Sequence, residues 1–177
     1  MKELIQKIEQ WAEDRNIIKG STPIDQAMKL FSEFGELSDH VGDNELSKIP
    51  DDVGDIFVVL TIISKQFGKS IEVPNELHAD HQTLKSNVLW LGFSLTDTFT
   101  NTWSFHDNFD PSDSIHILNK IAELIGTDLE SCVKLAYEDI KDRKGVLIDG
   151  VFIKESNPAY AKAIKSLEEN FSVEDSK

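Results

Sequence analysis

The chain has little cysteine, no long apolar run and no signal-peptide core. Its single cysteine, Cys132, excludes a disulfide within the chain and suits a reducing compartment. The longest apolar run, residues 56–63, spans about two helical turns, whereas a membrane helix needs about 20 residues. Residues 1–11 are charged and amphipathic, unlike a secretory signal. We therefore expect a cytoplasmic protein with no membrane partner.

Basic residues are also scarce relative to acidic ones. The 177 residues include 18 Lys and Arg against 32 Asp and Glu, a formal net charge of −14. Non-specific binding to nucleic acid depends on a basic surface, so we expect no nucleic-acid partner. A phosphate-bearing ligand would need bound cations or a local basic cluster. The sequence also lacks a Walker-type glycine-rich loop and a Gly-x-Ser-x-Gly motif.

Apolar residues recur at helical spacing through most of the chain. The pattern predicts helices up to about 16, over 23–41, from about 48 to 67, through most of 78–104, over 115–125, from 129, and over about 158–169. The β-branched runs around Asp149-Gly150 predict a hairpin over 146–153. We expect one domain, residues 1–177, with an all-α fold: a helical bundle with a small C-terminal β-hairpin.

One pattern occurs twice: acid, apolar residue, glycine, acid. It reads Glu33-Phe34-Gly35-Glu36 and then Asp52-Val53-Gly54-Asp55. Acids three apart share a helix face, and a short connection makes the two helices antiparallel neighbours. Converging carboxylates repel unless a cation lies between them, and oxygen ligands suit Mg²⁺ or Mn²⁺. The sequence therefore predicts a metal site formed by four acids: Glu33, Glu36, Asp52 and Asp55.

Two details favour a site over the commoner alternative, a solvated helix face. Asp55 directly precedes the apolar run that begins at Ile56, where a carboxylate is costly to bury without a partner. A glycine inside a helix costs roughly 1 kcal/mol relative to alanine. Close approach of the two acid-bearing helices would explain both Gly35 and Gly54.

These motifs resemble those of the MazG-like, all-α nucleoside triphosphate pyrophosphohydrolases. Members of that family carry Glu-x-x-Glu on one helix and Glu-x-x-Asp on the next, often with glycine before the last acid. Residues 11–15, 135–145 and 149–155 are also similar to family segments, so the resemblance covers about 5–68 and 128–155. Asp52 replaces the usual Glu, and Ser32 replaces a further acid that is common there. Residues 70–125 look like an additional helical insertion.

The resemblance implies hydrolysis of a nucleoside triphosphate to monophosphate and pyrophosphate, in control of the nucleotide pool. It implies Mg²⁺, or Mn²⁺, held by the four acids, with Glu33 or Glu36 as the catalytic base that takes a proton from water. The sequence leaves the choice between them open. Family members are usually dimers or tetramers, so we expect a homo-oligomer. Alternatively, the insertion supplies the missing helices from within the chain.

Two groups of residues are candidates for binding the substrate. Trp11 and Arg15 share a helix face, and with Asn16 they would line a base pocket, although Trp11 is more often a core residue. The second group consists of lysines and an arginine that would reach the phosphates or, equally, form surface ion pairs or favour a helix dipole. It comprises Lys29, Lys48, Lys141, Arg143 and Lys144.

Two other functions remain open. The shortened Asp52 is compatible with a catalytically weak family member that binds nucleotide as a regulator. The charge of −14 permits an acidic protein that mimics nucleic acid and inhibits a DNA-binding enzyme. In that case, Mg²⁺ would change thermal stability little and Glu36→Gln would be nearly silent.

Overall fold

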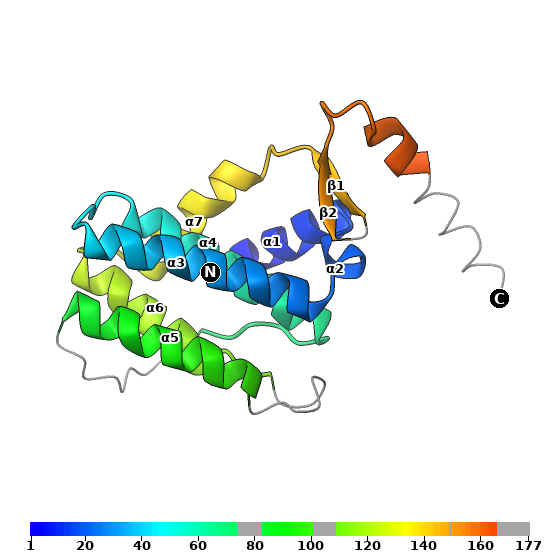
Figure 1. Cartoon of the computed structure of the whole chain (residues 1–177). Coiled ribbons are helices and arrows are strands. Elements are labelled where there is room, and N and C mark those ends of the chain that lie inside the picture. Colours follow the sequence, from blue (N-terminus) through cyan, green and yellow to red (C-terminus); the bar gives the residue numbers. More distant parts are fainter. Residues whose placement is uncertain (74–82, 101–108, 149, 166–177) are drawn as a thin grey trace.

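The computed structural model describes residues 1–73, 83–100, 109–148 and 150–165. The described part is mostly helical and carries a two-stranded antiparallel hairpin towards its C-terminal end (Figure 1). The helices are α1 (Lys2–Asp14), α2 (Ile17–Gly20), α3 (Pro23–Gly42), α4 (Ile49–Gln66), α5 (Leu84–Thr100), α6 (Ser112–Leu124) and α7 (Leu129–Ile140). The strands are β1 (Gly145–Ile148) and β2 (Val151–Lys154). The prediction of a helical fold with a small C-terminal hairpin is confirmed.

Helix α4 is the centre of the fold. Helices α1, α2, α3, α6 and α7 all pack against it. Its residues are buried almost all round, from Ile49 to Ser64, as expected for a helix that is apolar on every side. Within the described ranges, no helix is both long and apolar enough to cross a membrane.

Helix α3 begins as the sequence predicts. Thr22 caps it and Pro23 occupies its first turn. The Thr22 hydroxyl oxygen accepts a hydrogen bond from the backbone N–H of Asp25. The Asp25 carboxylate accepts one from the backbone N–H of Thr22, and the two bonds together form a capping box. This capping box fixes the residue at which α3 begins.

We expected both motif glycines to let α3 and α4 approach closely, but their surroundings are different. A Cβ at Gly54 would clash with the Cys132 carbonyl oxygen and lie 2.7 Å from Ala136 Cβ, both on α7. A Cβ at Gly35 would meet nothing within 4 Å. Gly54 therefore permits the α4–α7 contact, and Gly35 permits no close contact. The explanation predicted for the pair is wrong.

The described parts of the predicted insertion contain the two helices α5 and α6. Helix α5 packs against α6 and α3, and α6 packs against α4 and α7. At the α3–α5 contact, a Cβ on Gly92 would lie 2.8 Å from the Phe34 ring. Helix α5 begins at Leu84, whereas the sequence predicts helix from residue 78; residues 74–82 and 101–108 lie outside the described ranges.

The hairpin is attached to the junction of α1 and α2. The Leu147 amide donates to the Arg15 carbonyl at 2.8 Å, and the Gly150 amide donates to the Gly20 carbonyl at 3.2 Å. The first helix ends at Asp14 rather than Asn16, because Asn16 adopts a left-handed conformation with φ of 56°. Of the predicted tail helix, residues 160–165 are helical and 166–169 lie outside the described ranges.

Candidate metal centre

The four predicted acids lie on the two packed helices α3 and α4, and two electrostatic effects cross between these helices. The charge of Glu33 on α3 raises the pKa of Asp55 on α4. The charge of Glu36, one turn further along α3, raises the pKa of Asp52, nearly one turn earlier on α4. We call Glu33 and Asp55 the first pair, and Glu36 and Asp52 the second pair. One acid of each motif on α3 therefore acts electrostatically on an acid of α4, and the formation of one site by all four acids stays a prediction.

The first pair is short of positive charge. Burial, followed by the negative charges of Glu33 and Asp51, raises the pKa of Asp55 from 3.8 to about 7. Lys29 and Arg143 act in the opposite direction without cancelling the shift. Glu33 itself is only 5% exposed and forms an ion pair with Lys29, one turn earlier on α3. Added positive charge at this position would favour the ionised form of Asp55.

Two further acids lie beside the first pair and were not predicted. Partial burial and the charges of Asp139 and Glu33 raise the pKa of Asp51, while Arg143 lowers it. Asp51 is four residues before Asp55, so the shared helix face is visible in the sequence. Asp139 lies at the end of α7 and forms an ion pair with Arg143. Its proximity depends on the packing of α7 against α4, which no local pattern reveals.

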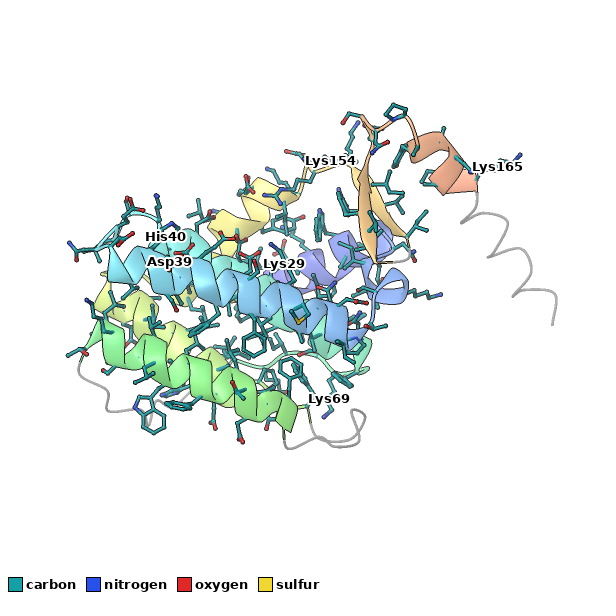
Figure 2. All side chains as sticks on the ribbon, viewed as in Figure 1. Lys29, Asp39, His40, Lys69, Lys154 and Lys165 are labelled. Atoms are coloured by element: carbon teal, nitrogen blue, oxygen red, sulfur yellow. The ribbon has the colours of Figure 1, made fainter. Side chains whose placement is uncertain are left out.

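The second pair has a histidine partner instead of a lysine. Asp52 is 6% exposed and its Oδ2 lies 2.7 Å from His40 Nδ1. Burial raises the pKa of Asp52, and the hydrogen bond and charge of His40 lower it. Glu36 is exposed and makes no hydrogen bond or ion pair with the rest of the described chain. Figure 2 shows His40 near the C-terminal end of α3 and Lys29 near its middle.

His40 was also missed by the sequence-based prediction. It lies four residues after Glu36, on the same face of α3, and this spacing was the available signal. Lys48, a candidate phosphate ligand, pairs with Glu45 rather than with Asp52. Glu45 in turn lies 3.7 Å from His40 Nε2. The second pair therefore connects through His40 and Glu45 to the surface.

The chemistry of the four acids fits a divalent cation, but their present side-chain positions do not converge on one. Over the described ranges, no three His, Cys, Asp or Glu side chains are grouped closely enough to hold a metal ion. Glu33 is directed to Lys29, whereas Asp52 uses only Oδ2 for its contact with His40 and keeps Oδ1 for another partner. Carboxylate oxygens suit Mg²⁺ and Mn²⁺, and the raised pKa of Asp55 marks the place where positive charge is lacking.

Of the three residues predicted to line a base pocket, Trp11 and Arg15 bind backbone at and just after the end of α7, and Asn16 binds backbone in β1. The Trp11 indole N–H donates to the Ile140 carbonyl at 2.8 Å. The Arg15 guanidinium stacks over the Trp11 ring and donates to the Lys141 and Arg143 carbonyls at 3.1 and 2.6 Å. Asn16 Nδ2 donates to the carbonyl of Leu147 at 2.8 Å. Their role in binding a base stays a prediction.

The cations after α7 differ in their relation to the acids. Lys141 pairs with Glu138, and Lys144 lies 3.5 Å from Glu155, both at the surface. Arg143 pairs with Asp139 and also lowers the pKa of Asp51 and of Asp55. Among these three cations, Arg143 is therefore the one whose charge acts on the carboxylates of α4.

Comparison with known proteins finds a phage relative of part of the chain. An uncharacterized 18.2 kDa protein in the rep–hol intergenic region of Haemophilus phage HP1 (strain HP1c1) is 52% identical over 66 residues, which are 37% of this chain and 40% of that protein. The chain thus matches about two fifths of the relative's length. No family model and no solved structure matches the chain.

Proposed function

We propose that this protein is a MazG-like nucleoside triphosphate pyrophosphohydrolase that depends on Mg²⁺ or Mn²⁺. The observation that supports it most is that α3 and α4, which carry the two acid motifs, pack against each other with Glu33 and Asp52 buried. An acidic protein that mimics nucleic acid would spread its acids over the surface. Here Glu33 and Asp52 are 5% and 6% exposed, and the pKa of Asp55 is raised to about 7.

In this proposal, the site residues divide into metal ligands, a general base and phosphate ligands. A bound divalent cation would neutralise the triphosphate and polarise its phosphoryl oxygens. Glu33, Asp52 and Asp55 hold that cation. Glu36 is our candidate for the general base, because it is exposed to water and has no hydrogen-bond partner within the described ranges. Lys29 and Arg143 lower the pKa of Asp55 through their charge and, in this proposal, would contact the phosphates.

We also propose that the protein is a homo-oligomer. Helix α3 exposes Ile24, Met28 and Phe31, which lie at the spacing of one helix face. The neighbouring α5 exposes Leu89, Trp90 and Phe93. Exposed apolar side chains grouped on a helix face often mark interaction sites. Light scattering should give a mass above 20.0 kDa, and Met28→Glu with Phe93→Glu should lower it; a wild-type monomer would refute this part.

The activity is tested by a product assay. Purified protein is incubated with Mg²⁺ or Mn²⁺ and a panel of ribo- and deoxynucleoside triphosphates, and pyrophosphate and phosphate are measured separately. We expect pyrophosphate together with the matching monophosphate, lost in Asp55→Asn and kept in Asp39→Asn, an exposed acid on α3. Tight nucleotide binding without turnover would favour a regulator. Absence of both product and binding would reject the proposed function.

A further inference from the structure

His40 makes a direct contact with the carboxylate of the second pair. Its Nδ1 lies 2.7 Å from Asp52 Oδ2, and the side chains are 23% and 7% exposed. An ionised carboxylate only accepts hydrogen bonds, so the imidazole N–H donates. The contact occupies one oxygen of Asp52 and leaves Oδ1 for another partner. It also crosses from α3 to α4, so His40 restrains Asp52 from outside its own helix.

The connection between α3 and α4 holds His40 in place. The Glu45 amide donates to the His40 carbonyl at 2.8 Å, the Lys48 amide to the Glu45 carbonyl at 3.0 Å, and the Asp52 amide to the Lys48 carbonyl at 3.3 Å. Side chains follow the same path, since Glu45 lies 3.7 Å from His40 Nε2 and pairs with Lys48. The His40 imidazole therefore lies between the carboxylates of Glu45 and Asp52, and backbone hydrogen bonds link the segment that carries all three residues.

Such an arrangement is typical of the residues that surround a metal ligand. Carboxylates that bind metals are commonly hydrogen-bonded by neighbours, which fix their orientation and strengthen binding. A group that only stabilised the α3–α4 packing would need no free carboxylate oxygen. Asp52 keeps one, since its hydrogen bond to His40 uses Oδ2 only.

We propose that His40 is a positioning residue, whose Nδ1–H holds the Asp52 carboxylate in the orientation that binds a divalent cation. This inference depends on the metal site of the proposed function. Loss of the Nδ1–H should weaken cation binding without changing the set of ligands. Loss of such a neighbour typically lowers metal affinity about 10- to 100-fold.

The test measures Mn²⁺ binding to the whole chain by electron paramagnetic resonance, without nucleotide. Four proteins are compared with the wild type: His40→Asn, His40→Gln, His40→Ala and Asp55→Asn. The Asn amide places a donor where Nδ1 lies, and the Gln amide places one near Nε2. We expect His40→Asn to bind within about 3-fold of wild type, and His40→Gln and His40→Ala to bind about 10- to 100-fold more weakly. Circular dichroism of each metal-free variant checks folding.

The possible results separate this inference from the proposed function. If the wild type binds no Mn²⁺, or Asp55→Asn binds as the wild type does, the metal site itself is rejected and this inference with it. If Asp55→Asn loses Mn²⁺ binding while His40→Gln and His40→Asn bind Mn²⁺ with the same affinity as each other, the positioning role is rejected and the metal site stands. Should His40→Ala fail to fold, the Asn and Gln variants still decide.

Discussion

The two carboxylate pairs arise from nearly the same sequence motif yet have different surroundings. The first pair, Glu33 and Asp55, is near the end of α7, where Asp139 and Arg143 lie, and the pKa of Asp55 is raised to about 7. The second pair, Glu36 and Asp52, is near the α3–α4 connection, where His40 donates to Asp52 at 2.7 Å. Neighbouring elements, not the motifs, therefore decide which acid is short of positive charge and which is held by a partner.

The largest expected effect concerns the exposed acid of the second pair. Glu36→Gln should lower turnover by about 100-fold or more, because removal of a general base typically costs 100- to 10,000-fold. The melting temperature of the metal-free protein should change little, since the side chain is exposed. Steady-state kinetics on the best nucleotide measure the loss. Near-normal rates would remove Glu36 from the mechanism and leave the base role to Glu33.

The next largest effect concerns the first pair and depends on pH. The pKa of Asp55 is about 7 in the folded protein and 3.8 as an ordinary group. Between these values the unfolded chain releases the proton that the folded state keeps, so stability falls as pH rises from about 4 to about 7. Above about 7 the loss is complete. Asp55→Asn should therefore raise the melting temperature of the metal-free protein most at pH 8.

Thermal unfolding from pH 4 to pH 8 with a chelator measures this difference. Asp39→Asn is the matched control, because it removes an exposed acid from α3 and its curve should parallel the wild type. Saturating Mg²⁺ should stabilise the wild type more than Asp55→Asn. Identical pH slopes for wild type and Asp55→Asn would contradict a raised pKa at this position.

The motif glycines provide a third way to compare the two helices. Gly54→Ala would place its Cβ against the Cys132 carbonyl and 2.7 Å from Ala136 Cβ. Overpacking of this kind costs about 1–3 kcal/mol in the free energy of unfolding. Urea unfolding measures the change. An unaltered midpoint would mean that α7 moves away from α4 freely.

The smallest expected effect has the opposite sign. A Cβ at Gly35 meets nothing within 4 Å, and alanine is favoured over glycine inside a helix by roughly 0.5–1 kcal/mol. Gly35→Ala should therefore raise the urea midpoint slightly, in contrast with Gly54→Ala. A clear loss of stability would show that the residue has a contact in an assembled form of the protein.

Much of the site follows from local sequence, and the remainder does not. The acid pairs and their helices are readable because residues three and four apart share a helix face. Asp51 lies four residues before Asp55, and His40 lies four residues after Glu36. The same spacing rule could therefore have identified both. Asp139 was not, since only the packing of α7 brings it near Asp51.

The base-pocket candidates also show the difference between local spacing, which the sequence reveals, and distant packing, which it does not. The sequence shows that Trp11 and Arg15 share a face, and the fold adds that this face binds the carbonyls of Ile140, Lys141 and Arg143. These contacts join residues more than a hundred positions apart, and helix periodicity contains no information about them. The basic segment that follows α7 is held by the first helix as well as by its own surface ion pairs.

By itself, the sequence determined most of the helices, the hairpin, the start of α3 at Pro23 and the two faces of paired acids. Each of these depends on interactions within a few residues: side-chain periodicity, capping and turn preference. The tertiary structure alone decided that Gly54 lies against α7, that His40 holds Asp52, and that the charge of Asp139 reaches Asp51. The physical reason is that burial and charge depend on which distant elements pack together, and these shift the pKa values of Asp51, Asp52 and Asp55.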